Sequence, residues 1–159
     1  MKKNIVIIHY NTPYLTECLV RSINLFVDGA IIYIFDNSDK EPFTAKFDNV
    51  TILDNIKGQI IDFDKWLENY PDRTKSSAFR NNYGSAKHCY SIDKCMDILG
   101  ENFILLDSDV LLKGDITKLF DEKLAFVGST EIWKAKTPMP NSRPRAKIRA
   151  IPYICFIKR

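Results

Sequence analysis

Short runs of consecutive apolar residues recur along the chain and predict buried β-strands. Four runs cover residues 4–8, 30–35, 50–53 and 102–106, and a fifth covers residues 124–128. Continuous apolar runs of this length, unlike alternating ones, are typical of strands covered on both faces of a sheet. The pattern therefore predicts a central sheet between two covering layers.

Two longer segments between these strands have the spacing of amphipathic helices. Residues 13–26 and 85–99 place apolar side chains at positions i, i+3, i+4 and i+7. Thr12-Pro13 predicts an N-cap followed by proline at the first helical position, and Gly100 predicts a helix end. Because strands and helices alternate, we expect an α/β fold with a doubly wound, mostly parallel sheet.

The remaining segments are predicted to be connections. Residues 55–82 mix glycine, proline, asparagine and charged residues around one short amphipathic piece, and residues 115–121 are compatible with a short helix. From about residue 135 onward the chain holds four prolines, at positions 138, 140, 144 and 152. Proline removes a backbone donor, so this last segment is expected to be irregular or to lie at a sheet edge.

Polar clusters follow three of the predicted strands. Tyr10-Asn11 follows the first, Asp36-Asn37-Ser38 the second, and the Asp-Ser-Asp motif of residues 107–109 the fourth. The carboxyl ends of parallel strands meet at one edge of the sheet, where ligands of α/β proteins bind. We therefore expect the three clusters to lie together and to form a binding site.

The Asp-Ser-Asp motif suggests a metal site. In an extended chain, Asp107 and Asp109 would point to the same side, about 6.7 Å apart. That spacing suits one carboxylate that binds a divalent cation directly and another that acts through water or a ligand group. Carboxylates without a partnered His or Cys favour Mg²⁺ or Mn²⁺, which also bind substrate phosphates. A helix cap or a solvated turn is the structural alternative.

Composition narrows the protein class. The chain has 159 residues, 45% hydrophobic and 27% charged, which indicates one globular domain. No apolar run approaches the length of a membrane span or of a signal-peptide core, so we expect a cytoplasmic protein. The four cysteines form no Cys-x-x-Cys pair and are predicted to be buried free thiols.

Charge is distributed unevenly along the chain. All 20 acidic residues precede residue 132, whereas residues 132–159 hold eight basic residues and no acidic one. Such a segment can meet phosphates, anionic lipid or nucleic acid. Aromatic residues are not interleaved with the basic ones in a stacking pattern, so nucleic acid is not an expected partner. We expect peripheral contact of this segment with the inner face of the membrane.

Other nucleotide-binding and phosphate-transfer folds fit poorly. A dinucleotide-binding Rossmann domain and a P-loop both need a glycine-rich turn after the first strand, and residues 9–13 have none. A phosphatase of the haloacid-dehalogenase type has its Asp-x-Asp on the first strand, with long sequence after it. Here the motif follows the fourth predicted strand, and 50 residues remain.

Four segments, in order, resemble glycosyltransferases of the GT-A fold, family 2. They are IVIIHYNTP at residues 5–13, IYIFDNSDK at 32–40, NYGSAKH at 82–88 and FILLDSDVLL at 103–112. The resemblance covers roughly residues 4–128 and implies a Rossmann-like, nucleotide-diphospho-sugar-binding fold. Residues 110–120 also resemble family 8, whose members retain the anomeric configuration, whereas family 2 enzymes invert it.

The resemblance implies a UDP- or GDP-sugar donor and a role for each matching residue. Asp107 would bind the ribose and the metal, and Asp109 the metal and the diphosphate, with Mn²⁺ or Mg²⁺ as the cofactor. The other nucleotide-binding residues would be Tyr10, Asn11, Asp36 and Lys87. His88, beside Lys87, is expected to be structural.

The acceptor side is less visible in the sequence. The sugar would pass to a glycan or lipid-linked acceptor, by inversion, and Glu131 is the one late acid that could serve as a base. We expect residues 1–130 to form the donor-binding domain and residues 131–159 to begin an acceptor region that is reduced or missing. The alternatives are a non-catalytic or truncated nucleotide-binding module, and a retaining family 8-like galactosyl- or glucosyltransferase.

Overall fold

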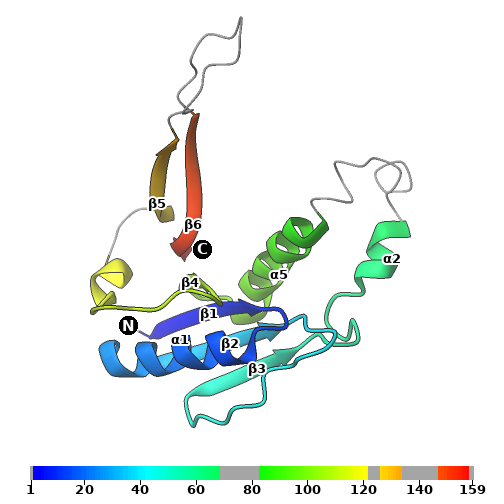
Figure 1. The fold of residues 1–159 in the computed structure, drawn as a ribbon, viewed down its shortest axis with the longest axis horizontal. Coiled ribbons are helices and arrows are strands. Elements are labelled where there is room, and N and C mark those ends of the chain that lie inside the picture. Colours follow the sequence, from blue (N-terminus) through cyan, green and yellow to red (C-terminus); the bar gives the residue numbers. More distant parts are fainter. Residues whose placement is uncertain (1, 69–82, 122–125, 134–146, 158–159) are drawn as a thin grey trace, which may run out of the picture.

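A six-stranded mixed sheet with helices on both faces forms the core of the molecule (Figure 1). The computed structural model describes residues 2–68, 83–121, 126–133 and 147–157. The sheet order is β3-β2-β1-β4-β6-β5. The strands are β1 (Lys3–His9), β2 (Ala30–Asp36), β3 (Val50–Asp54), β4 (Phe103–Asp107), β5 (Phe126–Trp133) and β6 (Lys147–Ile157).

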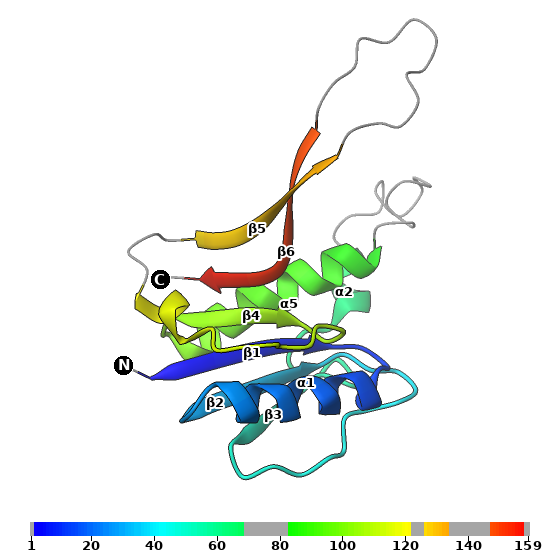
Figure 2. The ribbon, with the colours of Figure 1, turned by 60° about the vertical axis from the view of Figure 1, so that its left-hand side comes forward.

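The first four strands are parallel, and they confirm the predicted α/β class. Helices α1 (Pro13–Phe26) and α5 (Tyr83–Leu99) lie on opposite faces of these strands, as Figure 1 and Figure 2 show. Two shorter elements are α2 (Phe63–Glu68) and the 3-10 helix η1 (Thr117–Asp121). Within the described residues, no helix is both long enough and apolar enough to cross a membrane.

Alternate side chains of the parallel strands bury on alternate faces. On β1, Ile5 and Ile7 pack in the cluster that contains α1, whereas Val6 and Ile8 pack in the cluster that contains α5. Both faces of β1 are therefore dry, which explains why its sequence is continuously apolar. Such a strand is fixed in register, because a slip of one residue would exchange the two faces.

The start of α1 agrees with the prediction in position but lacks the side-chain capping bond. Pro13 does stand at the first helical position, but the side chain of Thr12 makes no capping hydrogen bond to the helix. Its hydroxyl lies 3.2 Å from the hydroxyl of Ser108, on the loop after β4. Thr12 is therefore the N-cap residue, as predicted, but its hydroxyl contacts the opposite side of the sheet edge rather than its own helix.

The C-terminal part of the chain also differs from the prediction. Residues 147–157 were expected to be irregular or edge-like, but they form β6, which lies between β4 and β5 and is antiparallel to both. Pro152 is tolerated because it falls at the register irregularity, where it has no pairing partner on either neighbour. A proline at that point costs no ladder hydrogen bond.

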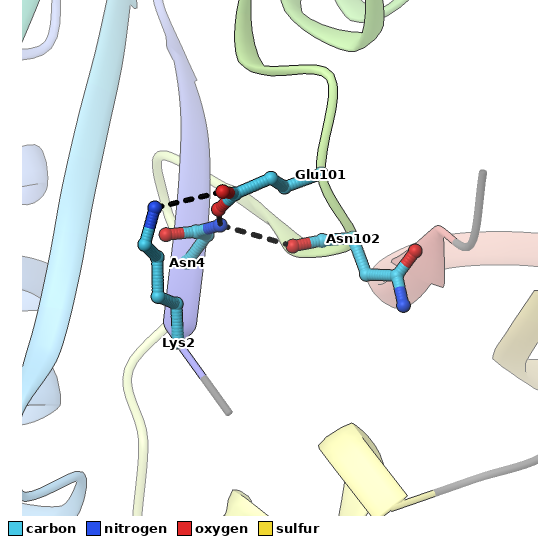
Figure 3. A network of polar contacts seen from close by, with 4 residues as sticks. All are labelled: Lys2, Asn4, Glu101 and Asn102. Carbon is cyan, nitrogen blue, oxygen red and sulfur yellow. Dashed lines mark hydrogen bonds and ion pairs between the residues drawn. The ribbon is translucent and has the colours of Figure 1, made fainter.

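The amino-terminal edge of the sheet is tied to the loop between α5 and β4 (Figure 3). The side-chain amide of Asn4, only 1% exposed, donates to Glu101 Oε2 at 3.0 Å and to the Asn102 carbonyl at 3.2 Å. Lys2 Nζ forms an ion pair of 2.7 Å with the other Glu101 oxygen. These contacts brace the start of β1 against the start of β4.

Cysteine reactivity gives a test of this fold. Cys18, Cys89 and Cys95 are free thiols, as predicted, but only Cys95 is buried, and Cys89 is exposed. Burial raises the pKa of the Cys95 thiol to about 12, so its reactive thiolate is almost absent at neutral pH. Iodoacetamide at pH 8 should therefore alkylate Cys89 readily and Cys95 only after unfolding, as measured by peptide mass spectrometry. Equal labelling of both in the native protein would contradict the packing of α5.

Candidate functional site

The predicted polar clusters do meet at the carboxyl edge of the parallel strands. In the sheet register, His9 of β1 is the partner of Asp36 of β2, and Ile8 is the partner of Asp107 of β4. The last residues of three strands therefore lie side by side. Tyr10 and Asn11 follow immediately after β1, so they extend the same edge.

The Asp-Ser-Asp motif is a turn and not an extended segment. Strand β4 ends at Asp107, and the carbonyl of Asp107 accepts the N–H of Val110 at 3.1 Å. The predicted spacing of two carboxylates along one strand is therefore wrong, because the chain reverses directly after Asp107. The contact of Ser108 with Thr12 holds this turn against the start of α1.

Asp107 lies in an environment that disfavours its negative charge. Burial raises the pKa of its carboxyl group, and the neighbouring Asp109 carboxylate raises it further. The His88 imidazole opposes this rise, with Nε2 at 3.6 Å from Asp107 Oδ1. Asp109 itself is exposed. A cation between the two carboxylates would relieve the repulsion that raises the pKa of Asp107.

The donor set fits a hard divalent cation that keeps other ligands. Among the described residues, no three His, Cys, Asp or Glu side chains come together as a metal cage. Two carboxylates at a sheet edge are, however, what Mg²⁺ and Mn²⁺ use when phosphates and water complete the coordination. The residues present therefore fit a cation that binds together with a phosphate ligand.

His88, which was expected to be structural, lies beside Asp107. The helix α5 runs back along the sheet and is followed by the short connection to β4, so its first turns lie at the carboxyl edge. That topology brings His88 to Asp107, although the two are 19 positions apart in the sequence. The signal available in the sequence was the position of His88 near the start of the helix that precedes the motif.

Lys87 is half-buried and faces a neighbouring aromatic ring. Its ammonium group lies 5.3 Å from the ring centroid of Phe63 on α2. A cation over an aromatic face is attracted by the ring, which links α5 to α2. Contact of Lys87 with the phosphates of a ligand remains a prediction.

Asp36 is a structural anchor in this conformation. Its carboxylate is 1% exposed and accepts the N–H of Ser38 at 2.9 Å and the N–H of Phe43 at 2.8 Å. Both oxygens thereby hold the loop that follows β2. The predicted contact of Asp36 with a nucleotide base would need this loop to move.

Asn11 clamps the same loop from the other side. Its side-chain oxygen accepts the N–H groups of residues 39, 40 and 41 at 3.0–3.2 Å, and its side-chain amide donates to Asp39. The residue has φ of 52°, a left-handed conformation that asparagine tolerates better than most residues. Asn11 is therefore held in the site by contacts within the protein.

Tyr10 is more accessible than Asn11 and Asp36, the two predicted nucleotide-binding residues beside it. Its side chain is 51% exposed. Partial burial and the neighbouring Asp39 carboxylate raise the pKa of its hydroxyl group, so the ring stays neutral at physiological pH. An exposed, neutral aromatic ring at this edge is suited to stacking on a base.

Glu131 lies within β5, not after it, and is the register partner of Arg149 on β6. Pairing of β6 with β4 stops at Leu106 and Ile154, whereas residues 147–151 of β6 pair with β5 alone. This part of the hairpin therefore extends past the end of β4 that carries Asp107. Figure 2 shows it rising away from the rest of the sheet.

Comparison with known proteins gives distant structural likeness and no sequence match. No protein-family model and no curated protein matches the chain. Among solved structures, the chain is similar to the apo form of the glycosyltransferase GlyE of Streptococcus pneumoniae TIGR4, with 13% sequence identity and a TM-score of 0.41. The match covers 96% of this chain and 34% of GlyE, so the chain spans about a third of that protein's length.

The role of Asp36 can be tested by comparison with Asp54, its register partner on β3. Asp36→Ala leaves two buried backbone N–H groups without an acceptor and should lower the free energy of unfolding by about 3 kcal/mol. Asp54→Ala, the matched control, removes one exposed bond to the N–H of Ile56 and should cost less than about 1 kcal/mol. Urea denaturation measures both. Equal losses would show that Asp36 does not anchor the loop.

Proposed function

We propose that this chain binds a nucleoside-diphosphate sugar together with Mn²⁺ or Mg²⁺ and acts as the donor-binding part of a glycosyltransferase. One observation carries the proposal. Asp107 and Asp109 lie at the carboxyl end of an interior parallel strand, where burial and mutual repulsion raise the pKa of Asp107. A cation that binds together with a phosphate ligand would reduce the repulsion between these two carboxylates, which favours its binding at this position.

The surroundings of the pair support a nucleotide donor. The His88 imidazole and the Lys87 ammonium group come from the adjacent turn of α5 and are suited to the negative charge of a diphosphate. The exposed ring of Tyr10 offers a stacking surface for the base. Together with the ordered resemblance to family 2 glycosyltransferases, this favours a UDP- or GDP-linked sugar.

The transfer step follows from this arrangement. A bound Mn²⁺ or Mg²⁺ would supply neutralisation of the charge that develops on the departing diphosphate. A base removes the proton of an acceptor hydroxyl, the oxygen attacks the anomeric carbon, and the bond to the diphosphate breaks with inversion. We assign the base to Glu131, because its part of the hairpin extends past the Asp107 end of β4.

The acceptor is proposed to be a glycan or a lipid-linked sugar. Residues 132–159 hold eight basic residues and no acidic one, and part of this segment forms β6. Basic side chains near a membrane are attracted to anionic lipid headgroups. A peripheral position at the inner face of the membrane would bring a lipid-linked acceptor to the hairpin.

Calorimetric titration with UDP or GDP in Mn²⁺ tests the donor site. The wild-type chain should bind one of them with Mn²⁺ and lose this binding in EDTA. Asp109→Asn should abolish the metal-dependent binding and leave the free energy of unfolding within about 0.5 kcal/mol of wild type, because Asp109 is exposed. Asp97→Asn, at an exposed position near the end of α5, is the matched control and should bind normally.

Two results would contradict the proposal. A folded wild-type chain that binds no nucleoside diphosphate in Mn²⁺ would exclude the donor site. Unfolding caused by Asp109→Asn would show that the motif serves the fold and not a metal, which is the structural alternative drawn from the sequence. Binding without sugar transfer to any acceptor would leave the donor site and exclude catalysis by this chain alone.

A further inference from the structure

A continuous chain of hydrogen bonds joins the ends of β2 and β3 to α5. The Ser91 hydroxyl donates to the Lys87 carbonyl at 2.8 Å and accepts from Asn37 Nδ2 at 2.8 Å. Asn37 Oδ1 in turn accepts from Asn55 Nδ2 at 2.8 Å. Asn55 Oδ1 accepts the N–H groups of residues 60 and 61 at 2.9 and 2.7 Å.

The direction of this chain is determined by its chemistry. A carbonyl oxygen can only accept, so the hydroxyl proton of Ser91 is committed to Lys87. The Ser91 oxygen must then accept, which orients the amide of Asn37 with its nitrogen toward α5 and its oxygen toward Asn55. Rotation of one member would leave a neighbour without a partner, so the network holds a single arrangement.

Ser91 is the first buried residue among the described side chains of α5. Its side chain is fully buried, whereas none of the side chains described ahead of it on the helix, at positions 87–90, is buried. Beyond it, Ile92, Cys95 and later residues pack in the apolar cluster under the sheet. Contacts through Asn37 and between Lys87 and Phe63 therefore help to hold the turn of α5 that precedes Ser91.

That turn carries His88, the partner of Asp107. His88 and Ser91 are three positions apart on the helix and therefore neighbours on its surface. A shift of this turn would move the His88 imidazole away from Asp107, where Nε2 now lies 3.6 Å from Oδ1. The distance between imidazole and carboxylate thus depends on where Ser91 is held.

We propose that Asn37 and Ser91 are positioning residues, which hold α5 so that His88 faces Asp107. The geometric part of this proposal is independent of the activity. Its consequence for ligand binding rests on the proposed function, because only a metal–diphosphate site would use the oriented His88. Neither residue is proposed to touch the ligand.

The test compares Ser91→Ala and Asn37→Ala with Asn4→Ala. Asn4 is the control, because its side chain, like that of Asn37, makes two hydrogen bonds on the α5 side of the sheet, but at the opposite edge. The first readout is the NMR chemical shift of the His88 imidazole at one fixed pH. The chain has two histidines, so buried His9 is an internal reference.

In both Ser91→Ala and Asn37→Ala, the His88 resonances should move toward those of Asp107→Asn, in which the contact is removed, while those of His9 stay in place. In Asn4→Ala the His88 resonances should remain at their wild-type positions. His88 resonances that are unchanged in both folded test variants would overturn the proposal. If one of the test variants does not fold, the His88 resonances are measured in Ser91→Cys instead, because its thiol is a weaker hydrogen-bond acceptor at the same position.

The second readout is the dissociation constant of UDP or GDP in Mn²⁺, for whichever nucleotide the wild-type chain binds. Ser91→Ala and Asn37→Ala should raise it about tenfold, as loss of an outer-shell contact at a metal site does. Asn4→Ala should leave it unchanged. A wild-type chain that binds neither nucleotide would refute the proposed function, while the His88 shifts would still decide the positioning role.

Discussion

The parallel pairing of β1 with β4 is the interaction on which the rest of the structure depends. These strands are almost 100 residues apart in the sequence, and their register sets Ile5 against Ile104 and Ile8 against Asp107. Both faces of the pair are buried, by α1 on one side and α5 on the other. Apolar side chains on both faces of β1 and β4 specify the register of this pair. The packing of these side chains therefore places Asp107, at the end of β4, at the edge of the sheet.

Most polar residues at this edge serve the fold itself. Asp36 and Asn11 hold the loop after β2, and Asn37 and Asn55 connect the strand ends to α5. Buried polar groups of this kind stay paired because an unpaired one is costly. Because these side chains are already paired within the protein, the proposed ligand contacts fall on the groups around Asp107 and Tyr10.

The parts of the fold that the sequence predicted are those whose signal is local. The strand positions followed from short apolar runs and the two long helices from their spacing, and the parallel order placed the polar clusters at one edge. The predictions that were wrong include a local turn as well as contacts between distant segments. The Asp-Ser-Asp motif turns instead of extending, and β6 enters the sheet through pairing with β4. Thr12 is the N-cap of α1 as predicted, but its hydroxyl contacts Ser108 instead of capping the helix.

The sequence by itself determined which residues are apolar, where strands and helices form, and that acidic and amide side chains follow the strands. Only the tertiary structure decided which of those side chains are free to act. Asp36 and Asp107 are the same residue type and both end parallel strands, β2 and β4, which lie on either side of β1. Asp36 is closed in by a loop whose N–H groups it accepts, whereas Asp107 faces His88 at a partly open edge. That difference arises from long-range contacts, because hydrogen-bond satisfaction depends on which segments meet in space.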